Sequence, residues 1–391
     1  MRFFTYDGVP LWRDARVLRA TAQIVSVVIV VSALFFVIGN VLDAADKRGF
    51  SLGFGFLKEE AGFLIPESVI DYGAEDSFQH AFLVGVLNTL KVAVLGIVLA
   101  TTLGIIIGIA RISSNWLVSK IANVYIETFR NIPLLIQLFF WYFGVFLLLP
   151  PVQESIRWPG PVFLSNRGFF AVWASPSSSF AWWLLFLLGG ILLAVAVRAA
   201  LARLQLRLGR ATHPNLGALA AFVLLPAIGW FLVGENPLIK DIPELGRFNF
   251  EGGLRFTPEF AALLVGLVIY TASFIAEIVR AGILSVQRGQ AEAARALGLT
   301  ELQTMQSVVV PQAMRVIIPP LISQCLNLTK NSSLGIAIAF PDLFFVGRTM
   351  INQAGRAVPI FLMIMAAYLV MSLTYAVIGN IYNRRVKYVD R

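Results

Sequence analysis

The chain has 391 residues, of which 58% are apolar and only 14% are charged, and its mean hydropathy is +0.78. Since a water-soluble globule cannot cover so much apolar surface, the composition indicates a membrane protein. The formal charge of +9 does not indicate nucleic-acid binding, because the basic residues follow the apolar segments instead of forming one face. Cys325, His80 and His213 are too few for a disulfide framework or a His/Cys metal site.

Apolar segments long enough to cross the membrane as helices recur along the whole chain. We predict eight spans, at residues 17–39, 81–110, 121–149, 181–199, 216–233, 260–281, 308–329 and 359–382. Strand-like alternation is absent, which argues against a β-barrel. The expected fold is therefore all-α and polytopic, with about eight transmembrane helices.

Basic residues are concentrated in alternate connections, beginning with Arg2, Arg13, Arg16 and Arg19 before the first span. By the positive-inside rule these connections are cytoplasmic, which places both termini in the cytoplasm. The first span has a basic lead like that of a signal peptide, but the leader is long, and we expect a retained anchor.

The chain divides by composition into four regions. Residues 1–79 hold the N-terminal segment, the first span and an outer loop; residues 80–149 and 258–391 hold the other long spans. Residues 150–257 begin with a proline-rich stretch and are expected to be an insertion with a helical hairpin. The hairpin loop carries Arg198, Arg203, Arg207 and Arg210, which we expect to lie at anionic headgroups.

The connection between the sixth and seventh spans predicts a helix, a break and a second helix. Residues 290–297 are strong helix formers, and Gly298 suits a left-handed helix end. Thr300 and Gln303 fit a capping box that begins the next helix. The first of these helices carries mostly alanines beside Glu292, so a partner protein can approach it closely. From the residues alone, a docking helix and a re-entrant connecting turn both remain open.

The stretch Glu292-Ala293-Ala294, with Gly298 and Val309-Val310-Pro311 after it, resembles the EAA loop of binding-protein-dependent ABC importer permeases. This resemblance implies a loop that seats in a cleft of a separate ATPase subunit. The residues to which it assigns this ATPase-coupling role are Arg288, Glu292, Ala293, Ala294, Arg295 and Gly298.

Residues 85–90, 127–137 and 330–334 resemble the polar amino-acid branch of the same family. The similarity covers about residues 80–150 and 258–385, the five-helix core of a type I ABC importer permease. With its insertion, the chain resembles the longer members of this family, which are permeases of general L-amino-acid and glutamate/glutamine/aspartate/asparagine systems. The resemblance implies a bacterial inner-membrane location, an ABC ATPase dimer that binds ATP and Mg, a second related permease and a periplasmic amino-acid-binding protein.

No phosphate-binding loop is present, because no lysine follows a glycine, so the chain is not expected to be an enzyme or to bind a cofactor itself. Energy must come from a partner ATPase or from an ion gradient. A secondary amino-acid carrier is therefore the alternative, although the internal repeats and mid-membrane carboxylates that it predicts are not evident.

A polar run at residues 327–333 interrupts apolar sequence and predicts a broken helix whose second half begins after Ser332. Asn327, Lys330, Asn331 and Ser332 either line the substrate path, where they suit an α-carboxylate, or join and cap two helices.

Charged residues within the predicted spans have structural interpretations. Residues three apart are expected to form ion pairs, namely Glu127 with Arg130 and Glu277 with Arg280. Lys91 lies ten residues into the second span, and three roles remain open for it. It extends its ammonium group to the membrane surface, pairs with a carboxylate elsewhere in the bundle, or lines a cavity.

Overall fold

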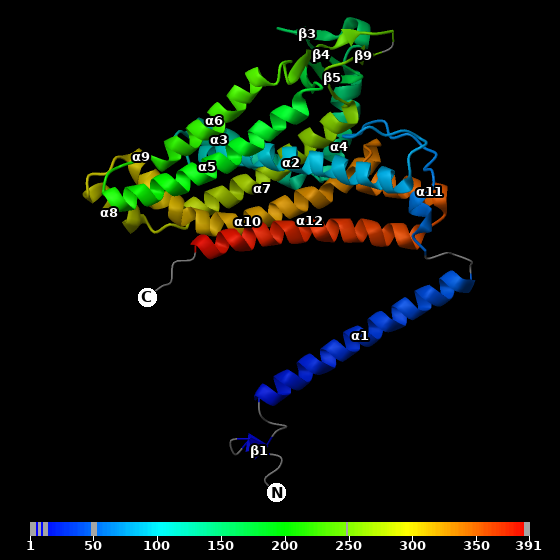
Figure 1. Cartoon of the computed structure of the whole chain (residues 1–391). Helices are drawn as coiled ribbons and strands as arrows, with labels where there is room; N and C mark the ends of the chain where they lie inside the picture. Colours follow the sequence, from blue (N-terminus) through cyan, green and yellow to red (C-terminus); the bar gives the residue numbers. More distant parts are fainter. Residues whose placement is uncertain (1–4, 7–8, 11–14, 48–52, 248, 387–391) are drawn as a thin grey trace. The chain divides into compact units, whose positions relative to one another are not determined.

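The computed structural model describes residues 5–6, 9–10, 15–47, 53–247 and 249–386 (Figure 1). It divides into two compact units. The first unit consists of Met1–Lys91 with Pro341–Arg384, and the second consists of Val92–Phe340 with Arg385–Arg391. Helices dominate both units, as expected for a polytopic membrane protein.

Within the described residues, six helices are long and apolar enough to cross a membrane. They are α2 (Phe78–Arg111), α5 (Phe180–Leu208), α6 (Pro214–Leu232), α7 (Pro258–Leu284), the continuous helix Glu301–Ile338 that contains α10 (Val310–Asn331), and α12 (Ala357–Val386). They correspond to the second predicted span and to the fourth through the eighth.

The other two predicted spans differ from the expectation. The segment at 121–149 is a bent pair, α3 (Trp116–Asn131) followed by Leu134–Leu148, with an angle of 103° between them. Pro133 lies at the break, where it cannot donate a backbone hydrogen bond and disfavours a helical residue before it. The first span falls in α1 (Ala15–Lys47), whose described apolar stretch Thr21–Ala33 is shorter than a span.

In the first unit, the N-terminal half of α2 binds both the loop before it and Pro341, which lies just before α11 (Leu343–Ala354). The amide of Asn88 donates to the carbonyls of Glu67 and Pro341, both at 2.8 Å. Lys91 forms an ion pair with the Glu67 carboxylate at 2.6 Å. Of the three roles considered for Lys91, the structure thus supports the one in which it pairs with a carboxylate.

In the second unit, α7 is the central helix, and α2 and α10 approach it through glycines. A Cβ on Gly108 would lie 2.7 Å from the Ala276 carbonyl, and one on Gly104 would lie 2.6 Å from Ile275. On the other side, a Cβ on Gly282 would lie 2.3 Å from Ile317 of α10. These glycines let the helix backbones pack closely, as small residues do in membrane proteins.

A small β region, absent from the all-α expectation, lies at the N-terminal end of α7. We call it the β cap and define it as residues 150–176 and 238–256. Its main sheet has the antiparallel order β10-β5-β4-β3. The strands of the β cap are β3 (Ile156–Trp158), β4 (Val162–Ser165), β5 (Gly168–Ala171), β6 (Trp173–Pro176), β7 (Leu238–Asp241), β8 (Glu244–Leu245), β9 (Phe250–Glu251) and β10 (Leu254–Phe256).

The β cap has its own small core, in which Phe170 is fully buried against Val152 and Phe250. Its strands are only two to four residues long, too short for an alternating pattern to be recognised in the sequence. Outside it, the described part of the N-terminus holds one further strand pair, β1 (Thr5–Tyr6) with β2 (Val9–Pro10).

The helices α5 and α6 form the hairpin expected within the insertion. Trp183 of α5 donates to the Pro226 carbonyl of α6 at 3.0 Å, and Gly190 packs against the Pro226 ring. Since Pro226 lies inside α6 and has no N–H, it leaves the Phe222 carbonyl one turn earlier without its usual helical donor. The indole of Trp183 instead ties α5 to α6 through the carbonyl of Pro226 itself.

Candidate functional site

The segment between α7 and α10 contains the two short helices that the sequence predicts. The first, α8 (Arg288–Ala296), ends at Gly298, whose φ is +82°. The N–H groups of Gly298 and Leu299 donate to the carbonyls of Arg295 and Ala294, which completes a Schellman ending. Because a side chain is disfavoured at this φ, glycine is required by the backbone and not by crowding.

The second helix, α9 (Glu301–Thr304), begins with the predicted capping box. The Thr300 hydroxyl accepts from the Gln303 N–H at 3.3 Å, and the Gln303 side chain accepts from the Thr300 N–H at 2.9 Å. A π-helical turn, Met305–Val309, then leads directly into α10. The loop is therefore joined to the long helix without a flexible break.

An ion pair that the sequence analysis did not identify holds α8 against α9. Arg295 donates to both carboxylate oxygens of Glu301, from Nε at 2.7 Å and from a terminal nitrogen at 3.1 Å. Both side chains are exposed, so water screens the pair and its contribution to stability is small. Its two-point geometry favours one angle between the helices.

The outward surface of α8 combines small side chains with apolar ones. Ala294 is buried toward the rest of the unit, whereas Glu292, Ala293 and Ala296 face outward. Leu297, at the end of α8, is 83% exposed. We call the exposed residues Arg288, Glu292, Ala293, Ala296 and Leu297 the α8 surface. Such a surface suits a docking partner, because small residues permit close approach and a leucine supplies apolar contact.

The α8 surface lies at the opposite end of α7 from the β cap (Figure 1). Since α7 has 27 residues, these ends are about 40 Å apart. Because α7 packs tightly against α10 at Gly282, a displacement of α8 acts on both helices at once. The arrangement can therefore transmit a movement at one end of the unit along two packed helices.

The polar run at 327–333 does not break the helix in the predicted way. The helix α10 continues through Asn331 and tightens to a 3₁₀ helix over Ser332–Ile338. Thr329 donates to the Cys325 carbonyl at 3.0 Å and Ser332 to the Thr329 carbonyl at 2.8 Å. Since these hydroxyls bond to the preceding turn, the polar run remains helical. The prediction of a second helix that begins with free N–H groups after Ser332 is therefore wrong.

The predicted path residues accordingly separate into two sets. Ser332 is fully buried, with its hydroxyl bonded to the backbone. Asn327 and Lys330 are exposed in the second unit and lie one turn apart, with Asn331 on the adjacent face.

Of the two predicted ion pairs, one is formed. Arg280 binds the Glu277 carboxylate, with its closest contact at 2.5 Å. Glu127 and Arg130 do not pair. Asn131 instead donates to the Glu127 carbonyl at 2.7 Å, and the Arg130 guanidinium lies over the Phe274 ring, 5.2 Å from its centroid.

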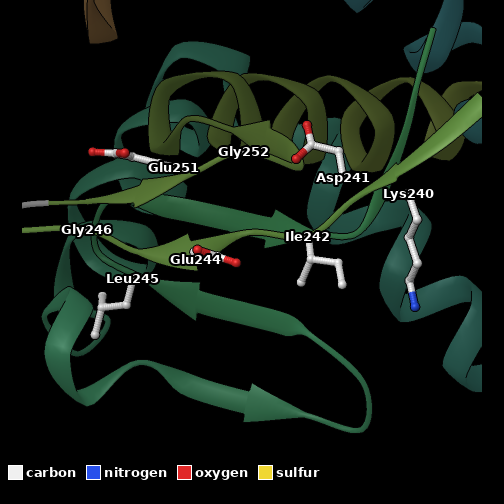
Figure 2. A pocket seen from close by; sticks show the side chains of 8 residues that line it. All are labelled: Lys240, Asp241, Ile242, Glu244, Leu245, Gly246, Glu251 and Gly252. Carbon is white, nitrogen blue, oxygen red and sulfur yellow. The ribbon is translucent and has the colours of Figure 1, made fainter. Parts of the chain in front are cut away.

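A hollow of about 530 Å³ lies in the β cap beside β7, β8 and β9. Figure 2 shows that the carboxylates of Asp241, Glu244 and Glu251 point in different directions from their strands. Among the described residues, no group of three or more His, Cys, Asp or Glu side chains is arranged to hold a metal ion. The hollow therefore provides no convergent site.

The chain matches known proteins over most of its length. Residues 100–388 match the family described as binding-protein-dependent transport system inner membrane component. The chain is 44% identical over 371 residues to the putative amino-acid ABC transporter permease protein YhdX of Escherichia coli, with 94% of each chain covered. It is also 44% identical over 375 residues to the general L-amino acid transport system permease protein AapQ of Rhizobium johnstonii, covering 94% of this chain and 92% of that one.

A third relative is the glutamate/glutamine/aspartate/asparagine transport system permease protein BztB of Rhodobacter capsulatus. It is 38% identical over 424 residues, covering 97% of this chain and 96% of the relative. Among solved structures, an amino acid ABC transporter with histidines matches with a TM-score of 0.47 and 23% identity, covering 79% of this chain and 95% of that one.

Proposed function

The chain belongs to the family of binding-protein-dependent transport system inner membrane components, and we propose that it is a permease subunit of an ATP-driven importer of polar L-amino acids. It is a transport component and not itself an enzyme. The substrate class follows the names of its relatives, which are amino-acid permeases over nearly their whole length.

The observation that carries this proposal is the geometry of α8, Gly298 and α9. We assign the α8 surface to docking of an ABC ATPase subunit. The ordered helix end at Gly298, the Thr300 capping box and the Arg295–Glu301 pair make this segment stiff. A stiff helix transmits a displacement, whereas a flexible loop would absorb it. ATP and Mg belong to the partner subunit, whose ATPase cycle supplies the energy.

Transport would proceed by alternating access. Closure of the ATPase dimer displaces α8, which moves the ends of α7 and α10 together because these helices pack at Gly282. Their opposite ends then move so that the substrate path opens outward to a docked, loaded binding protein. ATP hydrolysis and reopening of the dimer return the helices to the starting arrangement.

Asn327, Lys330 and Asn331 are proposed to border the substrate path, while Ser332 only supports the backbone beside it. The exposure of Asn327 and Lys330 one turn apart within the second unit, with the half-buried Asn331 beside them, supports this assignment. A lysine ammonium and two amides are suitable partners for the α-carboxylate of an amino acid.

The α8 surface faces the cytoplasm in this account and the β cap faces the periplasm, with both termini cytoplasmic. The excess of arginine and lysine on the α8 side supports this orientation. A periplasmic amino-acid-binding protein would deliver substrate at the other side. A second, related permease would complete the membrane core.

The direct test is to co-express the chain with its operon neighbours, purify it in mild detergent and identify the co-purifying subunits by mass spectrometry. We expect an ATPase subunit and a second permease. Glu292→Lys should release the ATPase because it reverses a charge on the α8 surface. Glu154→Lys is the matched control, since it reverses an exposed charge at the β cap.

Loss of the ATPase with Glu292→Lys alone supports docking at α8. Equal ATPase recovery from both variants and from the unmodified chain would refute the assignment of the α8 surface. Purification of the chain without any ATPase, but with uptake driven by an ion gradient, would favour the secondary carrier.

A further inference from the structure

Three arginines gather where α5 turns into α6. Arg203 and Arg207 lie four residues apart in α5 and therefore on one face of the helix. Arg210 follows Gly209, which ends α5 with a φ of +63°. The Thr212 hydroxyl donates to the Leu201 carbonyl at 2.8 Å and holds the turn against the last turns of α5. We call Arg203, Arg207 and Arg210 the arginine end.

The arginine end is exposed and lacks a carboxylate partner. All three side chains are exposed in the described chain, and none of its ion pairs involves them. No aspartate or glutamate occurs anywhere between Phe180 and Leu232. A cluster of three permanent positive charges therefore finds no counter-charge within the hairpin and attracts an anionic partner from outside it.

The length of the hairpin places this cluster at a membrane boundary. Trp182 is exposed, and Trp183 packs edge-to-face on Trp230, so indoles mark the end of the hairpin nearest the β cap. Tryptophans concentrate at the membrane interface. Arg203 lies 21 residues after Trp182 in the same helix, which is about 32 Å along its axis, close to the roughly 30 Å of a hydrocarbon core.

Apart from Gln205 and Gly209, the residues between the arginines are leucines. Leu204, Leu206 and Leu208 are all exposed, with Leu206 at 87%. Exposed leucines that alternate with arginines are unfavourable in water, but they fit the boundary between acyl chains and headgroups, where arginine extends its charged group toward the phosphates. A docking site on a soluble acidic protein would not account for these leucines.

We propose that the arginine end binds an anionic phospholipid, with the guanidinium groups of Arg203, Arg207 and Arg210 on the headgroup phosphate and the leucines against the acyl chains. Guanidinium suits this role because its planar donors engage phosphate oxygens in pairs. The assignment to the cytoplasmic leaflet rests on the orientation given under Proposed function, whereas the lipid site itself does not. The hairpin would then be held at a defined depth and tilt.

The test is to place the purified complex in nanodiscs of phosphatidylcholine with a minority of phosphatidylglycerol. The complex is then released from the nanodiscs, and the lipid molecules that remain bound to it are counted by native mass spectrometry. Arg203→Gln/Arg207→Gln removes two charges from the arginine end. Its matched control is Arg157→Gln/Arg167→Gln, which removes two exposed charges from the β cap. Arg203→Lys/Arg207→Lys keeps the charge without the paired donors.

We expect phosphatidylglycerol retention to fall about 25-fold in the glutamine variant, since each basic residue near an anionic surface contributes about fivefold. The lysine variant should retain more lipid than the glutamine variant, and the control should match the unmodified complex. Equal retention by the glutamine variant and the control would overturn the proposal.

Loss of a protein subunit with unchanged lipid retention would also overturn it, because the arginine end would then be a protein-docking surface. Lipid retention needs neither ATP nor uptake. A failure of the proposed function would instead appear in the subunit recovery and transport assays, so the two failures are distinguishable.

Discussion

The Lys91–Glu67 ion pair provides a stringent test of how the loop before α2 is fastened to that helix. Its atoms are 2.6 Å apart, and the Glu67 side chain is only 9% exposed, against 24% for Lys91. Lys91→Met removes the cation while retaining most of the apolar volume. The Glu67 carboxylate then remains largely buried without this counter-charge.

Removing one partner of a buried pair typically costs about 3–5 kcal/mol, whereas replacing both by apolar residues is often neutral. Since water reaches part of Lys91, we expect the lower end of this range. Lys91→Met should therefore lower the free energy of unfolding by about 3 kcal/mol, and Glu67→Leu by a similar amount. The double variant should lose only about 1 kcal/mol, which gives a coupling energy of several kcal/mol between the two positions.

Unfolding can be followed by tryptophan fluorescence during titration with sodium dodecyl sulfate in mixed micelles. Lys58→Met is the control, because Lys58 is an exposed lysine in the same loop and its loss should change stability by less than about 0.5 kcal/mol. Additive losses in the double variant would refute the reasoning, since they would mean that neither residue stabilises the protein through the other.

Three further predictions follow from other contacts. Gly108→Ala should lower the free energy of unfolding by about 1–3 kcal/mol in the same titration, because its Cβ would lie 2.7 Å from the Ala276 carbonyl. The control Gly144→Ala should lower it less, since a Cβ there has no neighbour closer than 3.5 Å. Equal losses of stability in the two variants would contradict the close packing of α2 on α7. Lys330→Ala should lower amino-acid uptake at least about tenfold through loss of a charged hydrogen bond, with unchanged ATPase recovery, and full uptake would exclude Lys330 from the path. Thr300→Ala should weaken α9 by about 1 kcal/mol and speed hydrogen exchange of its first amides, and unchanged exchange would show that the cap is dispensable.

Local signals predicted the structure of the segment that contains α8 and α9 well. The helix ending at Gly298 and the capping box at Thr300 depend on residues within a few positions of one another, so their pattern is visible in the sequence. The Arg295–Glu301 pair was missed because it spans the break, where no regular spacing applies. The bend at Pro133 carried a recognisable signal, but the apolar run around it favoured a single continuous span.

Features that depend on distant residues, or on which hydrogen bond a side chain forms, were not predictable in the same way. Glu67 lies 24 positions before Lys91 and outside the helix, so nothing in the spacing links them. The helical course through Ser332 depends on hydroxyl groups bonding to the preceding turn, whereas the sequence shows only a polar interruption. Short strands that pair across the α5–α6 hairpin, such as β6 with β7, likewise leave no periodic pattern.

Uptake of labelled glutamine by proteoliposomes tests the central claim most directly. The liposomes would contain the co-purified complex, with the candidate binding protein supplied on the side of the β cap and ATP on the side of α8. The account predicts uptake that requires ATP, persists when ionophores collapse all ion gradients, and is lost in the Glu292→Lys variant. Uptake that proceeds without ATP and disappears with the ionophores would contradict it.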